Sequence, residues 1–295
     1  MESMWSYGQH EEKEKELSTT SALPSCYTRP NSVDAWRHRR MLESILPIVE
    51  EVPDGQWLTV GDGKFGTDAA FLQTRGVDVT STSISTYTLE IAHSRGYIRK
   101  YAAENAEALS LANSSVDFVL CKESYHHFPR PPLGFYEMLR VARRAVILIE
   151  PMESKERVLA FLKTMIKRAL RDGSSDQFEE SGNFIYRLSI RETSKMLTAL
   201  GYMCLAWKGI NDFWYPPFAA AHCDSLSLGA IGTRAGIAVQ NLLVRLRLLN
   251  YGLAAVICFK EPPAPSLRSR LKGSGFVVVD LPENPYRYEA GNALS

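Results

Sequence analysis

Residues 57–68 read WLTVGDGKFGTD, an apolar run that breaks into glycines immediately before a helical pattern. Buried parallel strands have short apolar runs of this kind, and glycines directly after such a strand let the backbone turn sharply and approach a ligand closely. The helix that we expect at about 67–75 would point its free N–H groups at that ligand. Gly61, Gly63 and Gly66 spell G-x-G-x-x-G, a turn that serves nucleotide cofactors of more than one chemistry.

Short apolar runs alternate with helical patterns after this turn. Alternation of this kind predicts right-handed crossovers and a parallel sheet that is covered by helices on both faces. Ligands of such sheets bind at the carboxyl ends of the strands, which is where the glycine turn falls. The expected strands are 57–60, 77–82, 97–102, 116–121 and 145–149, and the expected helices between them are 67–75, 86–95 and 133–143.

The pattern divides the chain into three parts. Residues 1–30 are polar and lack hydrophobic periodicity, which predicts a flexible N-terminal tail. Residues 31–260 form the predicted α/β domain, with a helical insert at about 153–200 and 214–250, and residues 261–295 form a C-terminal extension. Further helices are expected within 33–52 and at 155–171, 190–200 and 233–248, and further strands at 202–207, 252–260 and 275–280.

Composition and charge exclude several classes of protein. The chain has 34 Lys and Arg against 33 Asp and Glu, so a net charge of +1 recruits no nucleic acid. Five scattered cysteines without a C-x-x-C pair argue against a disulfide scaffold and a zinc knuckle. Signal-peptide and membrane-spanning patterns are absent from the sequence. We therefore predict a cytoplasmic protein without a metal, and the basic helix at 155–171 leaves peripheral membrane contact open.

Two further segments follow the second and third strands of the predicted sheet. Nucleotide-binding α/β proteins usually place an acidic residue after strand two, where it accepts hydrogen bonds from the ribose hydroxyls. Ser83 and Ile84 stand there instead, and a serine lacks the charge-assisted, bidentate geometry of a carboxylate. Asn105 and Ala106 follow strand three, where amide and backbone groups would contact an adenine edge; a helix cap with a turn explains this segment equally well.

The fourth expected strand ends in a loop that contains the paired histidines His126 and His127. Histidine titrates near neutrality and removes protons from hydroxyl groups, so this position suits a general base that Glu123 would orient. Structural packing of one histidine explains the pair about equally well. A metal site that adds Cys121 and Glu123 is less favoured, because adjacent histidines rarely both reach one tetrahedral ion.

In their order, these segments resemble a class I methyltransferase that depends on S-adenosyl-L-methionine (SAM), over about residues 33–260. The resemblance implies a doubly wound, mostly parallel seven-stranded sheet whose last strand is antiparallel. It also implies a SAM pocket, with S-adenosyl-L-homocysteine (SAH) as the product. The cofactor-binding residues that it implies are Val60, Gly61, Asp62, Gly63, Gly66, Ser83, Ile84, Asn105, Ala106 and Lys122.

Two positions depart from the pattern of this family. Thr59 stands where an acid often precedes the first glycine, and Ser83 stands where the ribose acid is usual. Both changes reduce the affinity expected for SAM, unless Asp62 compensates. The run 122–131, with Glu150-Pro151 behind it, resembles a bacterial subgroup associated with surface-polysaccharide or glycan synthesis, which implies a glycan or small-molecule acceptor.

The sequence thus predicts a SAM-dependent methyltransferase that methylates a hydroxyl group of a sugar, glycan or small molecule. His126 or His127 would be the general base, and Glu123 would lie beside it. Two alternatives stay open. A catalytically inactive, methyltransferase-like binding module is favoured by Thr59 and Ser83, whereas the glycine motif permits a nicotinamide-dependent oxidoreductase.

Overall fold

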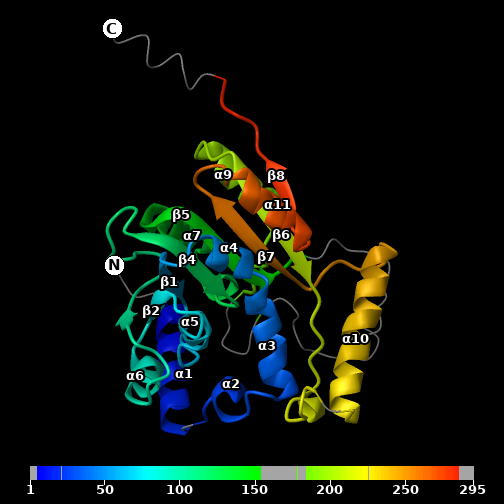
Figure 1. Cartoon of the computed structure of the whole chain (residues 1–295). Coiled ribbons are helices and arrows are strands. Elements are labelled where there is room, and N and C mark those ends of the chain that lie inside the picture. Colours follow the sequence, from blue (N-terminus) through cyan, green and yellow to red (C-terminus); the bar gives the residue numbers. More distant parts are fainter. Residues whose placement is uncertain (1–4, 21, 154–177, 179–183, 225, 286–295) are drawn as a thin grey trace.

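One sheet lies at the centre of the computed structural model, which describes residues 5–20, 22–153, 178, 184–224 and 226–285 (Figure 1). Within these residues the sheet has eight strands in the order β3-β2-β1-β4-β5-β7-β6-β8. The predicted α/β fold with a mostly parallel, doubly wound sheet is therefore confirmed. The strands are β1 (Gln56–Val60), β2 (Asp78–Ser83), β3 (Tyr101–Ala103), β4 (Val116–Lys122), β5 (Ala142–Pro151), β6 (Cys204–Ile210), β7 (Leu253–Phe259) and β8 (Val277–Asp280).

Strand direction changes on one side of the sheet. Strands β1 to β5 pair in parallel. Strand β7 runs antiparallel between β5 and β6, as the resemblance implied for the last strand of the domain. Strand β8 pairs antiparallel with β6 and gives the sheet one strand more than the predicted seven. The predicted C-terminal extension thus contributes to the sheet through β8.

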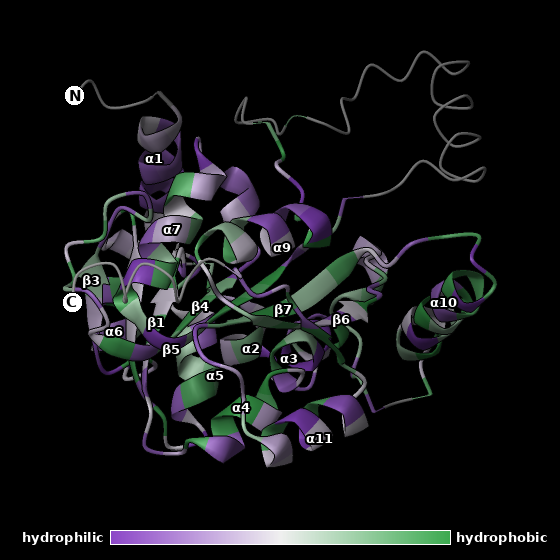
Figure 2. Ribbon diagram, turned by 90° about the horizontal axis from the view of Figure 1, so that it is seen from above, coloured by the Kyte–Doolittle hydropathy of each residue, from purple (hydrophilic) through white to green (hydrophobic). Residues whose placement is uncertain are grey.

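Helices cover both faces of the sheet. Side chains alternate along each strand, so Trp57 points to one buried cluster and Leu58 to the other. Helices α3, α4, α5, α6 and α11 pack on the first face, and α7 and α9 pack on the second. Figure 2 shows the hydrophobic strands enclosed between them. The bounds are α3 (Val33–Glu43), α4 (Leu46–Glu51), α5 (Thr67–Gln73), α6 (Tyr87–Ser94), α7 (Pro131–Val141), α9 (Ile190–Ala199) and α11 (Pro265–Gly273).

Burial on both faces explains why the strands were visible in the sequence. Every residue of β7 is buried, so its segment reads as a continuous apolar run. The expected helix within 33–52 is two helices instead, α3 and α4, because Pro47 has no backbone N–H and opens a new helix in its first turn. The expected strand at 97–102 is shorter and later than predicted, since only Tyr101–Ala103 pair with β2.

The structure differs from the predicted flexible N-terminal tail. Residues Trp5–Thr20 form helix α1, which packs against α6, and Ser25–Thr28 form the short helix α2. In the predicted insert, α10 (Leu228–Arg245) contacts α3, whereas the basic helix expected at 155–171 lies outside the described residues. No helix in the described part of the chain is long and apolar enough to cross a membrane.

Candidate functional site

The glycine turn after β1 has the backbone conformation that requires glycine. Gly61 has a φ of +74° and Gly66 a φ of +65°, in the left-handed region that side chains disfavour. A Cβ at Gly61 would also overlap the side chain of Ser124, which begins the loop after β4. A Cβ at Gly66 would lie 2.8 Å from a methyl carbon of Ile98. The turn therefore brings the β1 backbone directly against the β4 loop.

We expect Gly61→Ala to destabilise the protein more than Gly76→Ala. Gly76 has a similar φ of +80°, but nothing lies within 4 Å of its added Cβ. The free energy of unfolding that Gly76→Ala loses is therefore the cost of the left-handed backbone alone, roughly 1–2 kcal/mol. Gly61→Ala adds the overlap with Ser124, which costs on the order of another 1–3 kcal/mol. Chemical unfolding of both variants tests this, and equal losses would contradict the predicted overlap.

Asp62, a predicted cofactor-binding residue, holds the turn together. Its carboxylate accepts hydrogen bonds from the backbone N–H groups of Asp68 (3.1 Å) and Ala69 (3.0 Å) in the first turn of α5. It also accepts hydrogen bonds from the hydroxyls of Thr59 (2.9 Å) and Ser81 (3.0 Å). Because these donors come from β1, β2 and α5, this carboxylate fastens three elements. Thr59, which stands where the resemblance predicts an acid, is one of its donors.

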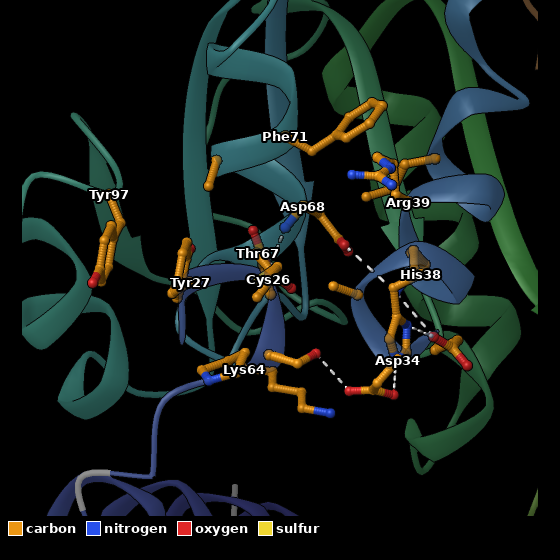
Figure 3. A pocket seen from close by; sticks show the side chains of 18 of the residues that line it. Cys26, Tyr27, Asp34, His38, Arg39, Lys64, Thr67, Asp68, Phe71 and Tyr97 are labelled. Atoms are coloured by element: carbon orange, nitrogen blue, oxygen red, sulfur yellow. Dashed lines mark hydrogen bonds and ion pairs between the residues drawn. The ribbon is translucent and has the colours of Figure 1, made fainter. Parts of the chain in front are cut away.

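Two adjoining lobes of one hollow open at the carboxyl edge of the sheet. The β2 lobe, about 750 Å³ in volume, is lined by the predicted residues Gly61, Gly63, Ser83, Ile84, Asn105 and Ala106. The α3 lobe, about 780 Å³, lies between α3 and α5 (Figure 3) and is lined by residues that include Asp62 and Lys122. Gly61, Lys64, Glu123 and His127 line both lobes. Both volumes are within the range of about 300–1,000 Å³ that is usual for ligand pockets.

The remaining predicted cofactor-binding residues lie behind this surface. Val60 is buried in the core cluster that contains α7, and Gly66 packs against Ile98. The structure thus brings six of the ten predicted residues together in the β2 lobe. It places Asp62 and Lys122 at the wall of the α3 lobe.

A charged network lies at the boundary between the two lobes. The Lys122 ammonium lies 3.5 Å from an Asp68 oxygen and 2.9 Å from a Glu123 oxygen, and His38 lies 3.4 Å from Glu123. Burial disfavours the ammonium, but the two carboxylates outweigh it and raise the pKa of Lys122. Burial likewise disfavours the Glu123 carboxylate, but Lys122 and His38 hold its pKa well below the usual value. Lys122 therefore neutralises the buried carboxylate of Asp68 and the half-buried one of Glu123.

The paired histidines lie in the short helix η1 (Tyr125–His127) after β4. Nδ1 of His126 lies 2.6 Å from Oε2 of Glu150, which is fully buried near the end of β5. The other oxygen of Glu150 accepts hydrogen bonds from the backbone N–H groups of Ser124 (2.9 Å) and Tyr125 (3.0 Å). A single carboxylate thus fixes both the η1 turn and the His126 ring.

The carboxylate at Nδ1 of His126 is that of Glu150 and not that of the predicted Glu123, and the histidine base itself stays a prediction. Glu123 is instead paired with Lys122 and His38. His126 lines the α3 lobe, whereas His127 lines both lobes, and the two rings lie 3.9 Å apart. Within the described residues, no group of three or more His, Cys, Asp or Glu is arranged to hold a metal ion.

Helix α1 covers the β2 lobe, which the sequence did not predict. Tyr7, His10, Glu14 and Leu17 line the lobe and follow one another at intervals of three or four residues, on one face of the helix. Tyr7 donates a hydrogen bond to the buried Glu107, which is also bonded to Arg130. This contact fastens the first turn of α1 to the segment after β3.

Comparison with known proteins gives one sequence match. Residues 58–149 match the family model described as a methyltransferase domain. No curated protein matches the chain in sequence.

Similar solved structures share little sequence with the chain. A SAM-dependent methyltransferase, possible histamine N-methyltransferase, from Thermotoga maritima is 15% identical over 88% of this chain and 100% of that chain, with a TM-score of 0.48. Phosphoethanolamine N-methyltransferase 2 from Haemonchus contortus, in complex with SAM, is 12% identical over 75% of this chain and 52% of its own, with a TM-score of 0.46. Magnesium protoporphyrin IX methyltransferase from Synechocystis, with bound SAH, is 15% identical over 57% of this chain and 75% of its own, with a TM-score of 0.44.

Proposed function

We propose that this chain, whose residues 58–149 match the family model of a methyltransferase domain, uses SAM as its cofactor and methylates a hydroxyl group of a small-molecule acceptor. The pair formed by His126 and Glu150 carries the proposal. It lies at the carboxyl edge of the sheet, with His126 on the wall of the α3 lobe, beside the lobe that we assign to SAM. A histidine in this position would remove the proton of the acceptor.

The residues of the β2 lobe fit the cofactor. Gly61 and Gly63 let neighbouring side chains pack directly against the turn, since a Cβ at Gly61 would overlap Ser124 and one at Gly63 would overlap Glu14 and Ser83. Ser83 and Ile84 come from the end of β2, and Asn105 follows β3, so the lobe extends past the strands where adenosine is expected. Gly61, Gly63, Ser83, Ile84 and Asn105 would hold SAM here.

The SAM sulfonium supplies an activated methyl group, so the chain has to align the acceptor and take up one proton. Because the Glu150 carboxylate only accepts hydrogen bonds, Nδ1 of His126 carries the hydrogen that points to it. Nε2 is then the basic nitrogen that would take the acceptor's proton. Glu150 would stabilise the imidazolium that forms, and its own contacts to the η1 backbone keep the ring oriented.

The α3 lobe supports a hydroxylated acceptor such as a sugar. Its wall includes the carboxylates of Asp34 and Glu123 and the imidazole of His38. These groups accept hydrogen bonds from hydroxyls. The stacked rings of Tyr27 and Tyr97, 3.9 Å apart, add apolar surface at the far end of the lobe (Figure 3).

Titration calorimetry with SAH and an assay of SAH release from SAM test the proposal. We expect the purified protein to bind SAH and to release it from SAM when a hydroxylated acceptor, such as a sugar, is present. Methylation of amines alone would refute the proposed O-methylation. Binding of SAH without turnover on either class of acceptor would favour the inactive binding module, and absence of SAH binding would refute the function.

A further inference from the structure

Strand β2 lacks the carboxylate that usually meets a ribose, but the structure brings one to the same place from helix α1. Ser83, at the end of β2, donates a hydrogen bond to Oε1 of Glu14, and Ser85 donates one to Oε2. The Glu14 carboxylate also lies against Gly63, where a Cβ would overlap it. It thus lies between the glycine turn and the end of β2, within the lobe assigned to SAM.

Glu14 is buried, unlike the other charged residues around it on α1. Glu14 is 9% exposed, whereas its neighbours Glu11, Glu12, Lys13 and Lys15 are exposed. Burial raises the pKa of Glu14, and hydrogen bonds from Ser83 and Ser85 oppose that shift. A carboxylate is costly to bury without partners, so its two serine donors and its position in the lobe call for an explanation beyond packing.

Other contacts hold the helix in register over the lobe. Tyr7, two turns before Glu14, is bonded to Glu107, and the ring of His10 lies 5.4 Å from that of His127. These contacts lie at intervals of three to four residues along α1. They place Glu14 opposite β2 and leave the other face of the helix exposed.

Resting on the function proposed above, we propose that Glu14 binds the ribose diol of SAM in place of the acidic residue that β2 lacks. A carboxylate has about four lone-pair sites, so Glu14 is able to accept hydrogen bonds from the ribose hydroxyls while Ser83 and Ser85 remain within reach. Hydrogen bonds from neutral hydroxyls to a charged oxygen are among the stronger ones in proteins. The cofactor is then enclosed between the sheet and an element from outside the α/β core.

Calorimetry with SAH and with its 2′,3′-dideoxy analogue tests this assignment in the full chain. We expect Glu14→Gln to weaken SAH binding roughly 10- to 100-fold, because it removes the charge of the acceptor. The wild type should prefer SAH to the dideoxy analogue by a similar factor, and Glu14→Gln should lose most of that preference. The preference compares two ligands on one protein, so it does not depend on the folded fraction of the variant.

Glu12→Gln is the matched control, since Glu12 is exposed on the same helix. It should bind both ligands as the wild type does. If Glu14→Gln keeps the preference for SAH, the assignment of the ribose contact is overturned while the proposed function stands. Tighter SAH binding by Glu14→Gln would also overturn it, because Glu14 would then compete with the ribose. If the wild type binds neither ligand, the proposed function itself fails.

Discussion

Replacing His126 with asparagine should lower kcat about 10²- to 10⁴-fold and leave the affinity for SAH within about twofold of the wild type. The magnitude is that of a lost general base. Asparagine is chosen because its amide N–H reaches about as far as Nδ1 and preserves a donor for the buried Glu150. The variant would thus lose the basic nitrogen without leaving an unpaired carboxylate. Steady-state methylation at saturating SAM gives kcat, and SAH calorimetry gives the affinity.

Two further variants separate the base from its neighbours. Glu150→Gln should reduce kcat less than His126→Asn does, because the ring loses its orientation but keeps its basic nitrogen.

His127→Ala should change the KM values more than kcat, since His127 lines both lobes. Full activity of His126→Asn would remove His126 from the mechanism.

Asp62→Ala should lower the free energy of unfolding by about 2–4 kcal/mol. It removes a helix N-terminal acceptor, worth roughly 1 kcal/mol, and leaves buried N–H and hydroxyl donors without a partner at about 1–3 kcal/mol in total. Asp78→Ala is the control, because Asp78 lies at the surface and its ion pair with Lys100 is worth less than about 1 kcal/mol. Urea unfolding compares the two, and similar losses would contradict the role given to Asp62.

Asp62 should also make the free energy of unfolding depend on pH. Burial, together with the nearby carboxylate of Asp68, raises the pKa of Asp62 to about 7 in the folded state, from an ordinary value of 3.8. The native state therefore binds more protons than the unfolded state between these values, so this contribution to stability is present at low pH and is lost as the pH rises through about 7. Asp62→Asn should lack this gain, and an identical pH profile would contradict the raised pKa.

Strand order made much of the β2 lobe predictable. Carboxyl ends of parallel strands meet at one edge, so residues after β1, β2 and β3 were expected together, and Gly61, Ser83 and Asn105 do line one lobe. Which carboxylate contacts His126 depends instead on the register between β4 and β5. Lys122 pairs with Ile149, which brings Glu150 level with the start of the η1 loop. A sequence pattern shows that both strands end here, but it does not show which of two nearby carboxylates faces the ring.

Helix α1 was missed for a different physical reason. Hydrophobic periodicity identifies helices whose buried face is apolar. The face of α1 that lines the lobe carries Tyr7, His10 and Glu14, whose polar groups meet polar partners, so residues 1–30 resembled a tail. The spacing of these residues was present in the sequence. The partners of these residues, such as Glu107, are far along the chain, so the spacing alone does not show that this face of the helix is buried.

The position of α1 has a consequence for the timing of catalysis. With SAM bound as proposed, each turnover would end with SAH between the sheet and α1, where Tyr7 is bonded to Glu107 and Glu14 to Ser83. Exchange of product for a new donor would then require these bonds to open, as opening of a lid controls product release in other enzymes. The residence time of SAH is on this basis a property of residues 5–20, and substitutions on α1 would change the pace of the cycle without touching the chemistry.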